Sequence, residues 1–307
     1  MSEPMTMDIQ GGARRERVRF SLWDKIMQFS DVGILAWSVI VYIFLYLPIF
    51  VLILFSFTKD PLGLTFHPFT LKWYTSSDPN ALGVIHDSGL LHALQQSLEV
   101  AIVSTAIAIV IGLSGSFALE RFRFHTRGLW DGLNYTKMVI AEVIAGVSTL
   151  LFFVQAADWV QNSTGYNLLA FMRPGMGAVL IAHVAWNIPF IVVILRARLK
   201  GFDRAIEEAG ADLGARPATV FLKVTLPAIA PGILAAALLS FTLSFDDFVT
   251  TFFVNGTTVT TLPLLIWSMV KRNVGPEINA ISTFMMAFSM GIIVFLELKA
   301  RISEDLV

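Results

Sequence analysis

Six apolar stretches constrain this chain more than any other feature of its sequence. They lie at residues 34–57, 97–119, 138–157, 177–195, 233–254 and 280–298. About 20 helical residues cross the hydrocarbon of a bilayer, so each stretch is long enough to span a membrane. A mean hydropathy of +0.70 and a charged fraction of 15% are typical of such a chain. We therefore expect an all-α membrane protein with six transmembrane helices.

The lysines and arginines between these stretches predict the orientation of the chain. Seventeen lie in residues 1–33, 120–137, 196–232 and 299–307, against five in the three other connections. The positive-inside rule places these four segments, and with them both termini, in the cytoplasm. A formal net charge of -1 argues against nucleic acid as a partner, and the lack of cysteine excludes disulfides and thiolate metal sites.

The N-terminal residues differ in character from the rest. No small-residue cleavage site follows the first apolar run, so we expect that run to be an anchor rather than a cleaved leader. Apolar residues recur at helical spacing from Leu22 to Phe29, which predicts a short amphipathic helix on the cytoplasmic membrane face. We therefore divide the chain into a basic tail with an interfacial helix, residues 1–33, and one six-helix domain, residues 34–307.

The polar segment at residues 196–232 has a pattern of its own. It contains a run of helix-forming residues from Ala205 to Leu213, and Gly214 then offers a break. Pro227 and Pro231 mark the entry to the next apolar stretch. This pattern predicts a short cytoplasmic helix followed by a stiff connection to the fifth span.

This segment resembles the cytoplasmic loop of ABC importer permeases, in which Glu-Ala-Ala is followed by three residues, Gly and, further on, Leu-Pro. The matching residues are Glu208, Ala209, Gly210, Gly214, Leu226 and Pro227. Gly210 replaces the family's second alanine, at a cost in helix propensity of about 1 kcal/mol. In that family the short helix sits in a groove of a separate ATPase and transmits its closure. The resemblance implies an ATPase-coupling role for Glu207, Glu208, Ala209, Gly210, Asp212 and Gly214, and the alternative is an ordinary polar loop.

The resemblance covers most of the chain from about residue 37 and has consequences for partners. The segment at 261–279, whose apolar run is too short to span, predicts a short outer helix and is similar to its counterpart in spermidine/putrescine importer permeases. The resemblance implies a transport subunit of a bacterial inner membrane, not an enzyme. Its implied partners are an ABC ATPase dimer, a second homologous permease subunit and an extracytoplasmic substrate-binding protein. Because the sequence has no Gly-x4-Gly-Lys-Ser/Thr pattern, we expect no cofactor here, with ATP and Mg held by the partner ATPase.

Asp246 and Asp247 need an explanation, because both lie inside the predicted fifth span. An acidic residue costs roughly 2.5 to 3.5 kcal/mol at mid-bilayer. The two lie about 20 Å along a helix that enters at Ile233, and adjacent helical residues point about 100° apart. The run from Ser244 to Val249 looks like the Ser-x-Asp-Asp pattern of polyamine-type permeases, which carry cationic substrates. Two interpretations stay open: a cation pathway for at least one acid, or a structural ion pair or hydrogen bond.

The fourth span contains a second polar group. His183 and Asn187 share one helix face at i, i+4 spacing, with Trp186 and Pro189 beside them. Pro189 interrupts the backbone ladder and could expose a carbonyl to a cavity. We consider His183, Trp186 and Asn187 as pathway residues, with packing as the alternative. The sequence shows no His-Glu-x-x-His motif, and we expect no metal site.

Two other classes of function are weaker alternatives. A membrane-embedded Mg-dependent enzyme would use paired carboxylates, but Asp246-Asp247 is the single adjacent Asp pair in the sequence and no second Asp-rich motif accompanies it. A secondary transporter often shows inverted repeats, which we do not find, and would leave segment 196–232 unexplained. The sequence favours a subunit of an ATP-driven ABC importer for a small cationic solute, with spermidine or putrescine favoured and another small solute as the alternative.

Overall fold

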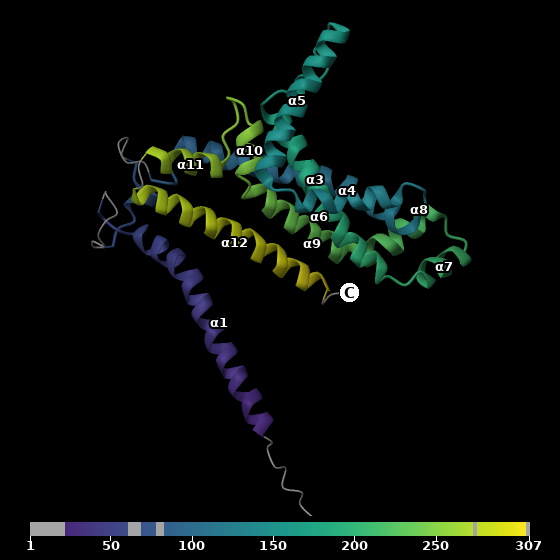
Figure 1. Ribbon diagram of the computed structural model, residues 1–307, viewed down its shortest axis with the longest axis horizontal. Helices are drawn as coiled ribbons and strands as arrows, with labels where there is room; N and C mark the ends of the chain where they lie inside the picture. The colour runs from purple at the N-terminus through teal and green to yellow at the C-terminus, as the bar shows by residue number, and fades with distance from the viewer. Residues whose placement is uncertain (1–21, 61–68, 78–82, 273–274, 305–307) are drawn as a thin grey trace, which may run out of the picture. The chain divides into compact units, whose positions relative to one another are not determined.

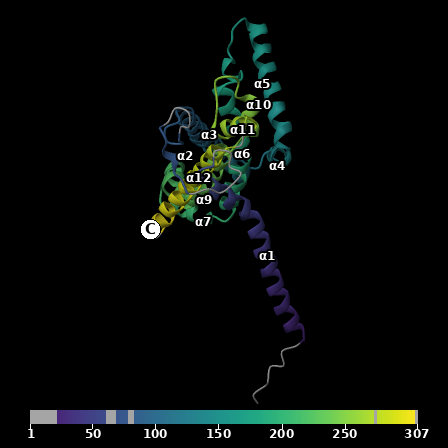
Figure 2. The same cartoon turned by 90° about the vertical axis from the view of Figure 1, so that its left-hand side faces the viewer.

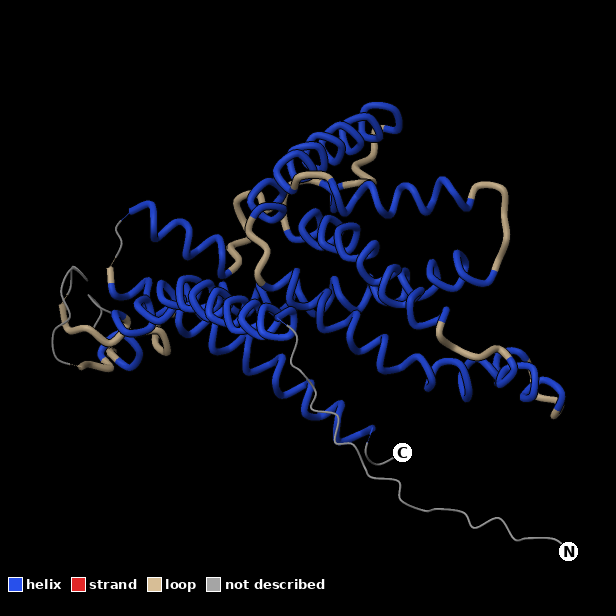
Figure 3. Tube along the Cα trace, turned by 60° about the horizontal axis from the view of Figure 1, so that its bottom comes forward, coloured by secondary structure: helices blue, strands red, loops and turns tan. Residues whose placement is uncertain are grey.

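A computed structural model describes residues 22–60, 69–77, 83–272 and 275–304. Over these residues the chain is helical (Figure 3). The single β-type pairing among them is an isolated bridge between Thr58 and Phe69. Six helices are long and apolar enough to cross a membrane: Gly33–Phe55, Ser88–Arg121, Glu142–Thr164, Met176–Lys200, Pro217–Phe245 and Pro276–Val294. The prediction of an all-α protein with six spans is confirmed.

The chain divides into two compact units, Met1–Leu52 and Ile53–Val307. The first unit holds nearly all of helix α1, Leu22–Phe55, which includes the first span. A separate short helix ahead of this span was expected from the sequence, but the helix continues from Leu22 into the span without a break. The low helix propensity of Gly33 costs about 1 kcal/mol, which is too little to end a helix that continues into a long apolar run. Residues 1–21 of the predicted tail lie outside the described part.

Three helices form the centre of the second unit and pack against one another: α3 (Ser88–Arg121), α6 (Met176–Lys200) and α9 (Leu226–Phe245) (Figure 1). Their common core contains Ala108, Ile191, Leu195 and Ala236, all buried. Gly112 lets α3 approach α6 closely, since a Cβ atom there would lie 2.6 Å from Cγ2 of Ile191. Where lipid supplies no hydrophobic drive between helices, such small residues permit close packing.

Five further helices surround this centre. They are α4 (Arg127–Val139), α5 (Glu142–Thr164), α10 (Val249–Val254), α11 (Leu262–Arg272) and α12 (Pro276–Glu304). Helix α5 packs against α10, and α11 lies against both α3 and α12 (Figure 2). Helix α11 confirms the short helix predicted within residues 261–279.

Several span boundaries differ from the sequence prediction, among them the start of the fifth span, which is Pro217 rather than residue 233. Helix α3 begins at Ser88 rather than near residue 97, because the Asp87 carboxylate accepts a hydrogen bond from the Leu90 amide at 3.1 Å and caps the helix. Helix α5 begins at Glu142 and continues to Thr164, where Gly165 ends it with a φ of 72°. Polar residues at these helix ends hid the extra turns from a search for apolar runs.

Short elements complete the second unit: α2 (Lys72–Thr75), η1 (Ala170–Met172), α7 (Ala205–Asp212), α8 (Pro217–Val220) and η2 (Phe221–Thr225). Helix α7 is the predicted short helix, and Gly214 follows it with a φ of 82°, which favours glycine. Segments α8, η2 and α9 form one span from Pro217 to Phe245. Within that span η2 is π-helical, a local widening that is frequent at functional sites.

Candidate functional site

The predicted fifth span, residues 233–254, breaks at the two adjacent acids. Helix α9 ends at Phe245, where the Asp246 amide still donates to the Thr242 carbonyl at 3.1 Å, and α10 begins at Val249. The prediction of one continuous helix over residues 233–254 is therefore wrong, and the acids lie in the break. The physical reason is the start of a new helix, because an aspartate just ahead of a helix offers acceptors to its first amides.

Asp247 is engaged by the protein itself. Its Oδ2 accepts hydrogen bonds from the amide and the hydroxyl of Thr251, at 2.9 and 2.8 Å, and its Oδ1 accepts from the Thr250 amide at 3.3 Å. His183 Nε2 lies 3.4 Å from Oδ2, and the Asp247 side chain is 10% exposed. These contacts use both carboxylate oxygens to hold the first turn of α10.

A buried layer of polar side chains continues from this point between the central helices. His183 Nε2 and the Thr251 hydroxyl are 2.9 Å apart, and Asn187 donates to the Ser244 hydroxyl at 2.7 Å. Ser104 of α3 also donates to the Ser244 hydroxyl, at 3.1 Å. The layer therefore joins α3, α6, α9 and α10 just beside the break. Among the described residues, Asn187 Oδ1 is a buried oxygen without a hydrogen-bond partner.

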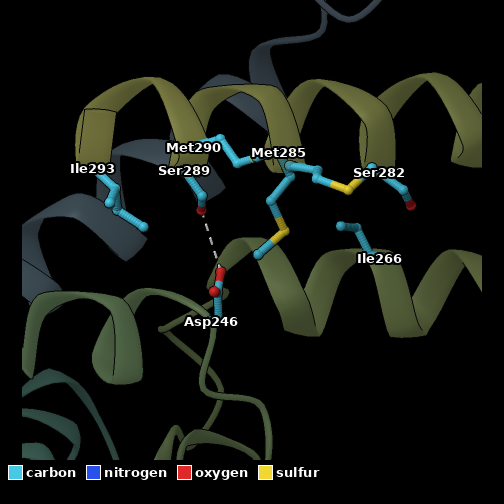
Figure 4. Close-up of a pocket in the computed structure, with 8 residues that line it drawn as sticks. Asp246, Ile266, Ser282, Met285, Ser289, Met290 and Ile293 are labelled. Carbon is cyan, nitrogen blue, oxygen red and sulfur yellow. Dashed lines mark hydrogen bonds between the residues drawn. The ribbon is translucent and has the colours of Figure 1, made fainter. Parts of the chain in front are cut away.

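Asp246 is placed differently from its neighbour. Its side chain is exposed, and Ser289 of α12 donates to Oδ1 at a long 3.4 Å (Figure 4). The carboxylate borders a cavity of about 340 Å³. The other residues that line it come from α11 and α12: Ile266, Ser282, Met285, Met286, Ser289, Met290 and Ile293. Asp246 thus offers a negative charge at the end of a mainly apolar cavity.

The structure brings some of the predicted pathway residues together and separates others. His183 and Asn187 share a buried face of α6, as their spacing predicts, and meet the break through Thr251 and Ser244. Trp186 lies elsewhere on α6, where it packs beside Phe190. Lys137 of α4 holds its Nζ 4.7 Å from the centre of the Trp186 ring, and partial burial lowers the pKa of Lys137 below its usual value.

The acids of α7 also fall into two groups. Glu208 and Asp212 are exposed at the surface of the short helix. Glu207 instead accepts hydrogen bonds at Oε1 from Arg121 of α3, at 2.9 Å, and from the Thr225 hydroxyl, at 2.6 Å. Ala209 is exposed and Gly210 faces Val220, with room for a methyl group because an added Cβ would lie 3.5 Å from Cγ2.

A second ion-pair group lies at the same end of α3. Arg196 of α6 pairs with Glu120 of α3 at 3.4 Å and with Asp131 of α4, and the Arg196 side chain is 12% exposed. Arg121, Thr225 and this group were not predicted from the sequence. Their partners are 18 to 86 residues apart along the chain, so no local pattern joins them. The cavity side chains of α12 were also missed, although three methionines within one span were a usable signal.

Sequence comparison identifies the class to which this fold and site belong. Residues 121–305 match the family described as binding-protein-dependent transport system inner membrane component, so the chain belongs to that family of membrane transport subunits. It is 35% identical over 261 residues to the spermidine/putrescine transport system permease protein PotC of Escherichia coli (strain K12), covering 85% of this chain and 91% of that protein. It is 34% identical over 268 residues to the putrescine transport system permease protein PotI of the same organism, covering 85% and 89%.

Solved structures show the same fold. A bacterial ABC transporter involved in the import of the acidic polysaccharide alginate matches with a TM-score of 0.63 and 16% identity, over 91% of this chain and 98% of that chain. The MetNI methionine ABC transporter matches with a TM-score of 0.51 and 16% identity, over 71% and 96%. The chain therefore has the fold of an ABC importer permease. The family is one of transport subunits of the inner membrane, not of enzymes.

Proposed function

We propose that this chain is the membrane subunit of an ATP-driven importer for a small, elongated cation, with spermidine and putrescine as the expected substrates. The observation that carries the proposal is the exposed Asp246 carboxylate in the cavity beside the break between α9 and α10. The relatives named for spermidine and putrescine transport support it. The alternative substrate is another small solute.

The cavity suits the two chemical parts of a polyamine. An ammonium group is attracted by the Asp246 carboxylate, and a methylene chain gains about 0.8 kcal/mol for each CH₂ that leaves water. The methionines of α12 suit such a chain, because their unbranched side chains adapt to ligands of irregular shape. A neutral solute of equal length would gain binding free energy from the apolar walls of the cavity but none from the charge of Asp246.

The arrangement of the acids argues against the enzyme alternative. A pair that chelates Mg²⁺ turns both carboxylates toward one point, whereas Asp246 faces the cavity and Asp247 caps α10. Over the part of the chain that the structure describes, no group of three His, Cys, Asp or Glu side chains gathers closely enough to hold a metal ion. The site is arranged to attract a cation rather than to perform chemistry on it.

The proposed assembly follows from the family and from helix α7. Residues Ala205–Asp212 form an exposed helix whose Glu208 and Asp212 are available to a partner. In our proposal α7 docks on an ATPase dimer that holds ATP and Mg, and a second homologous permease and an extracytoplasmic binding protein complete the importer. Both termini and segment 196–232 then face the cytoplasm.

Reconstitution of the complete importer in vesicles tests this function. We expect ATP-dependent uptake of labelled putrescine, competition by spermidine, and no competition by a neutral diol of the same length as putrescine. Competition by the diol as strong as that by spermidine would contradict the cationic assignment. Saturable uptake of an unrelated neutral solute, with no polyamine uptake, would favour the alternative substrate class.

A further inference from the structure

Glu207 has contacts that differ from those of every other acid on α7. Its Oε1 accepts one hydrogen bond from Arg121, the last residue of α3, and one from Thr225, the last residue of the π-helical segment η2. The Arg121 and Glu207 side chains are 13% and 24% exposed, and Thr225 is 1% exposed. Glu208 and Asp212 are therefore open to a partner protein, whereas Oε1 of Glu207 is occupied within the chain.

The two elements that Glu207 joins both lead to the break that holds Asp246. Helix α3 continues from Arg121 to Ser104, about 26 Å along its axis, and Ser104 there donates to the Ser244 hydroxyl. Segment η2 continues directly into α9, which ends at Phe245, the residue before Asp246. A displacement of α7 reaches the break along both helices when Glu207 holds them together.

The end of α3 is well suited to this role, because it is also fixed to its other neighbours. Glu120, next to Arg121, pairs with Arg196 of α6, and Arg196 in turn pairs with Asp131 of α4. Successive residues of one helix turn thus bind different elements. Segment η2, which ends at Thr225, is a π-helical turn, a form that is frequent at functional sites.

We propose that Glu207 is a positioning residue that holds the docking helix α7 to α3 and to the base of α9, and is not itself a contact for the ATPase. This inference rests on the proposed importer function, and it separates Glu207 from Glu208, with which the sequence analysis grouped it. The Arg121–Glu207–Thr225 contact passes the movement of α7 to α3, which meets the polar layer at Ser104, and to α9, which ends at the Asp246 break.

Charge reversal and charge exchange at this contact test the proposal in the reconstituted complex. Glu207→Arg and Arg121→Glu each place like charges together, whereas the double variant restores an opposite pair. The Thr225 hydroxyl can donate to the native acid and accept from an arginine in the exchanged pair, so it keeps a partner in both. Asp158→Arg is the matched control, since it reverses one charge of the exposed Arg173–Asp158 ion pair at 2.7 Å.

The quantities measured are co-purification of the ATPase, ATP hydrolysis, and polyamine imported for each ATP hydrolysed. We expect both single variants to retain the ATPase and the wild-type KM for the polyamine, but to import at least tenfold less for each ATP. The exchanged variant should regain at least half of the wild-type ratio, and the control should keep the full ratio.

Three outcomes would overturn the proposal: single variants with the wild-type ratio, an exchanged variant no better than the single variants, or single variants that fold but lose the ATPase. The last would make Glu207 a docking contact. If a single variant does not fold, the exchanged variant decides the question. Because it again has opposite charges at positions 121 and 207, the proposal predicts that it folds and regains import. Failure of the wild-type complex to import any polyamine would instead contradict the proposed function.

Discussion

Removing the charge of Asp246 should weaken the apparent affinity for a polyamine without disturbing the complex. Opposite unit charges 4 Å apart attract by about 1 kcal/mol in water and about 4 kcal/mol at an effective dielectric near 20. Asp246 borders a mainly apolar cavity but is exposed, so a value of about 2 kcal/mol is appropriate. That corresponds to roughly a 30-fold rise in the KM for Asp246→Asn.

Uptake of labelled spermidine and putrescine by the reconstituted importer, over a range of concentrations, measures this effect. Asn keeps the volume of the side chain, so we expect normal assembly and normal basal ATP hydrolysis. Ser289→Ala is the matched control, because it removes the 3.4 Å hydrogen bond to Asp246 and leaves the charge in place. Its KM should stay within about threefold of the wild-type value, as expected for the loss of one weak hydrogen bond.

The two adjacent acids should respond differently to the same substitution. Asp247→Asn keeps an oxygen that can cap α10, and asparagine is as good a cap as aspartate. It should therefore transport with a nearly normal KM. An unchanged KM for Asp246→Asn would refute a substrate role for that carboxylate, and an equal loss for both variants would refute the assignment of different roles.

Three further predictions concern helix α10, the docking helix α7 and the topology. Asp247→Ala should destabilise the purified chain by about 1 to 2 kcal/mol, because it leaves the Thr251 hydroxyl and the first amides of α10 without their acceptor; a thermal midpoint equal to that of the wild type would contradict this. Glu208→Lys should leave the chain in the membrane but abolish uptake, since a reversed charge in a docking groove costs several kcal/mol; normal ATPase association and transport would exclude the docking role. A cysteine at Asp212 should resist an impermeant reagent added outside intact cells, while one at Thr75 should react; the reverse pattern would invert the proposed topology.

Much of the fold follows from the sequence because membrane spans need long apolar runs, and six such runs are present. The short helix α7 was also predictable, since Gly214 ends it with the positive φ that glycine adopts readily. Helix ends were less predictable. Asp87 caps α3 nine residues ahead of the expected start, at a place where the sequence is too polar to count as part of an apolar run.

The candidate site was predictable only in part, for a physical reason. If residues 233–254 formed one helix, Asp246 and Asp247 would differ only in the direction in which their side chains point. The sequence does contain a sign of the break, because an aspartate two residues ahead of Val249 is a typical helix start. The apolar residues on both sides concealed it. The contacts of Glu207 could not be predicted, since Arg121 is 86 residues away along the chain.

The break explains why one of two adjacent acids can remain available in a membrane protein. The first amides of α10 include those of Thr250 and Thr251, which are buried and must therefore be satisfied by the protein, and Asp247 supplies the acceptors for both. Those amides are the nearest donors, so Asp246 is left with the long hydrogen bond from Ser289 as its one side-chain partner among the described residues. A carboxylate with so little internal stabilisation gains most from a cation that enters the cavity. The same local geometry that makes Asp247 structural therefore makes Asp246 the acid that a cationic substrate can stabilise.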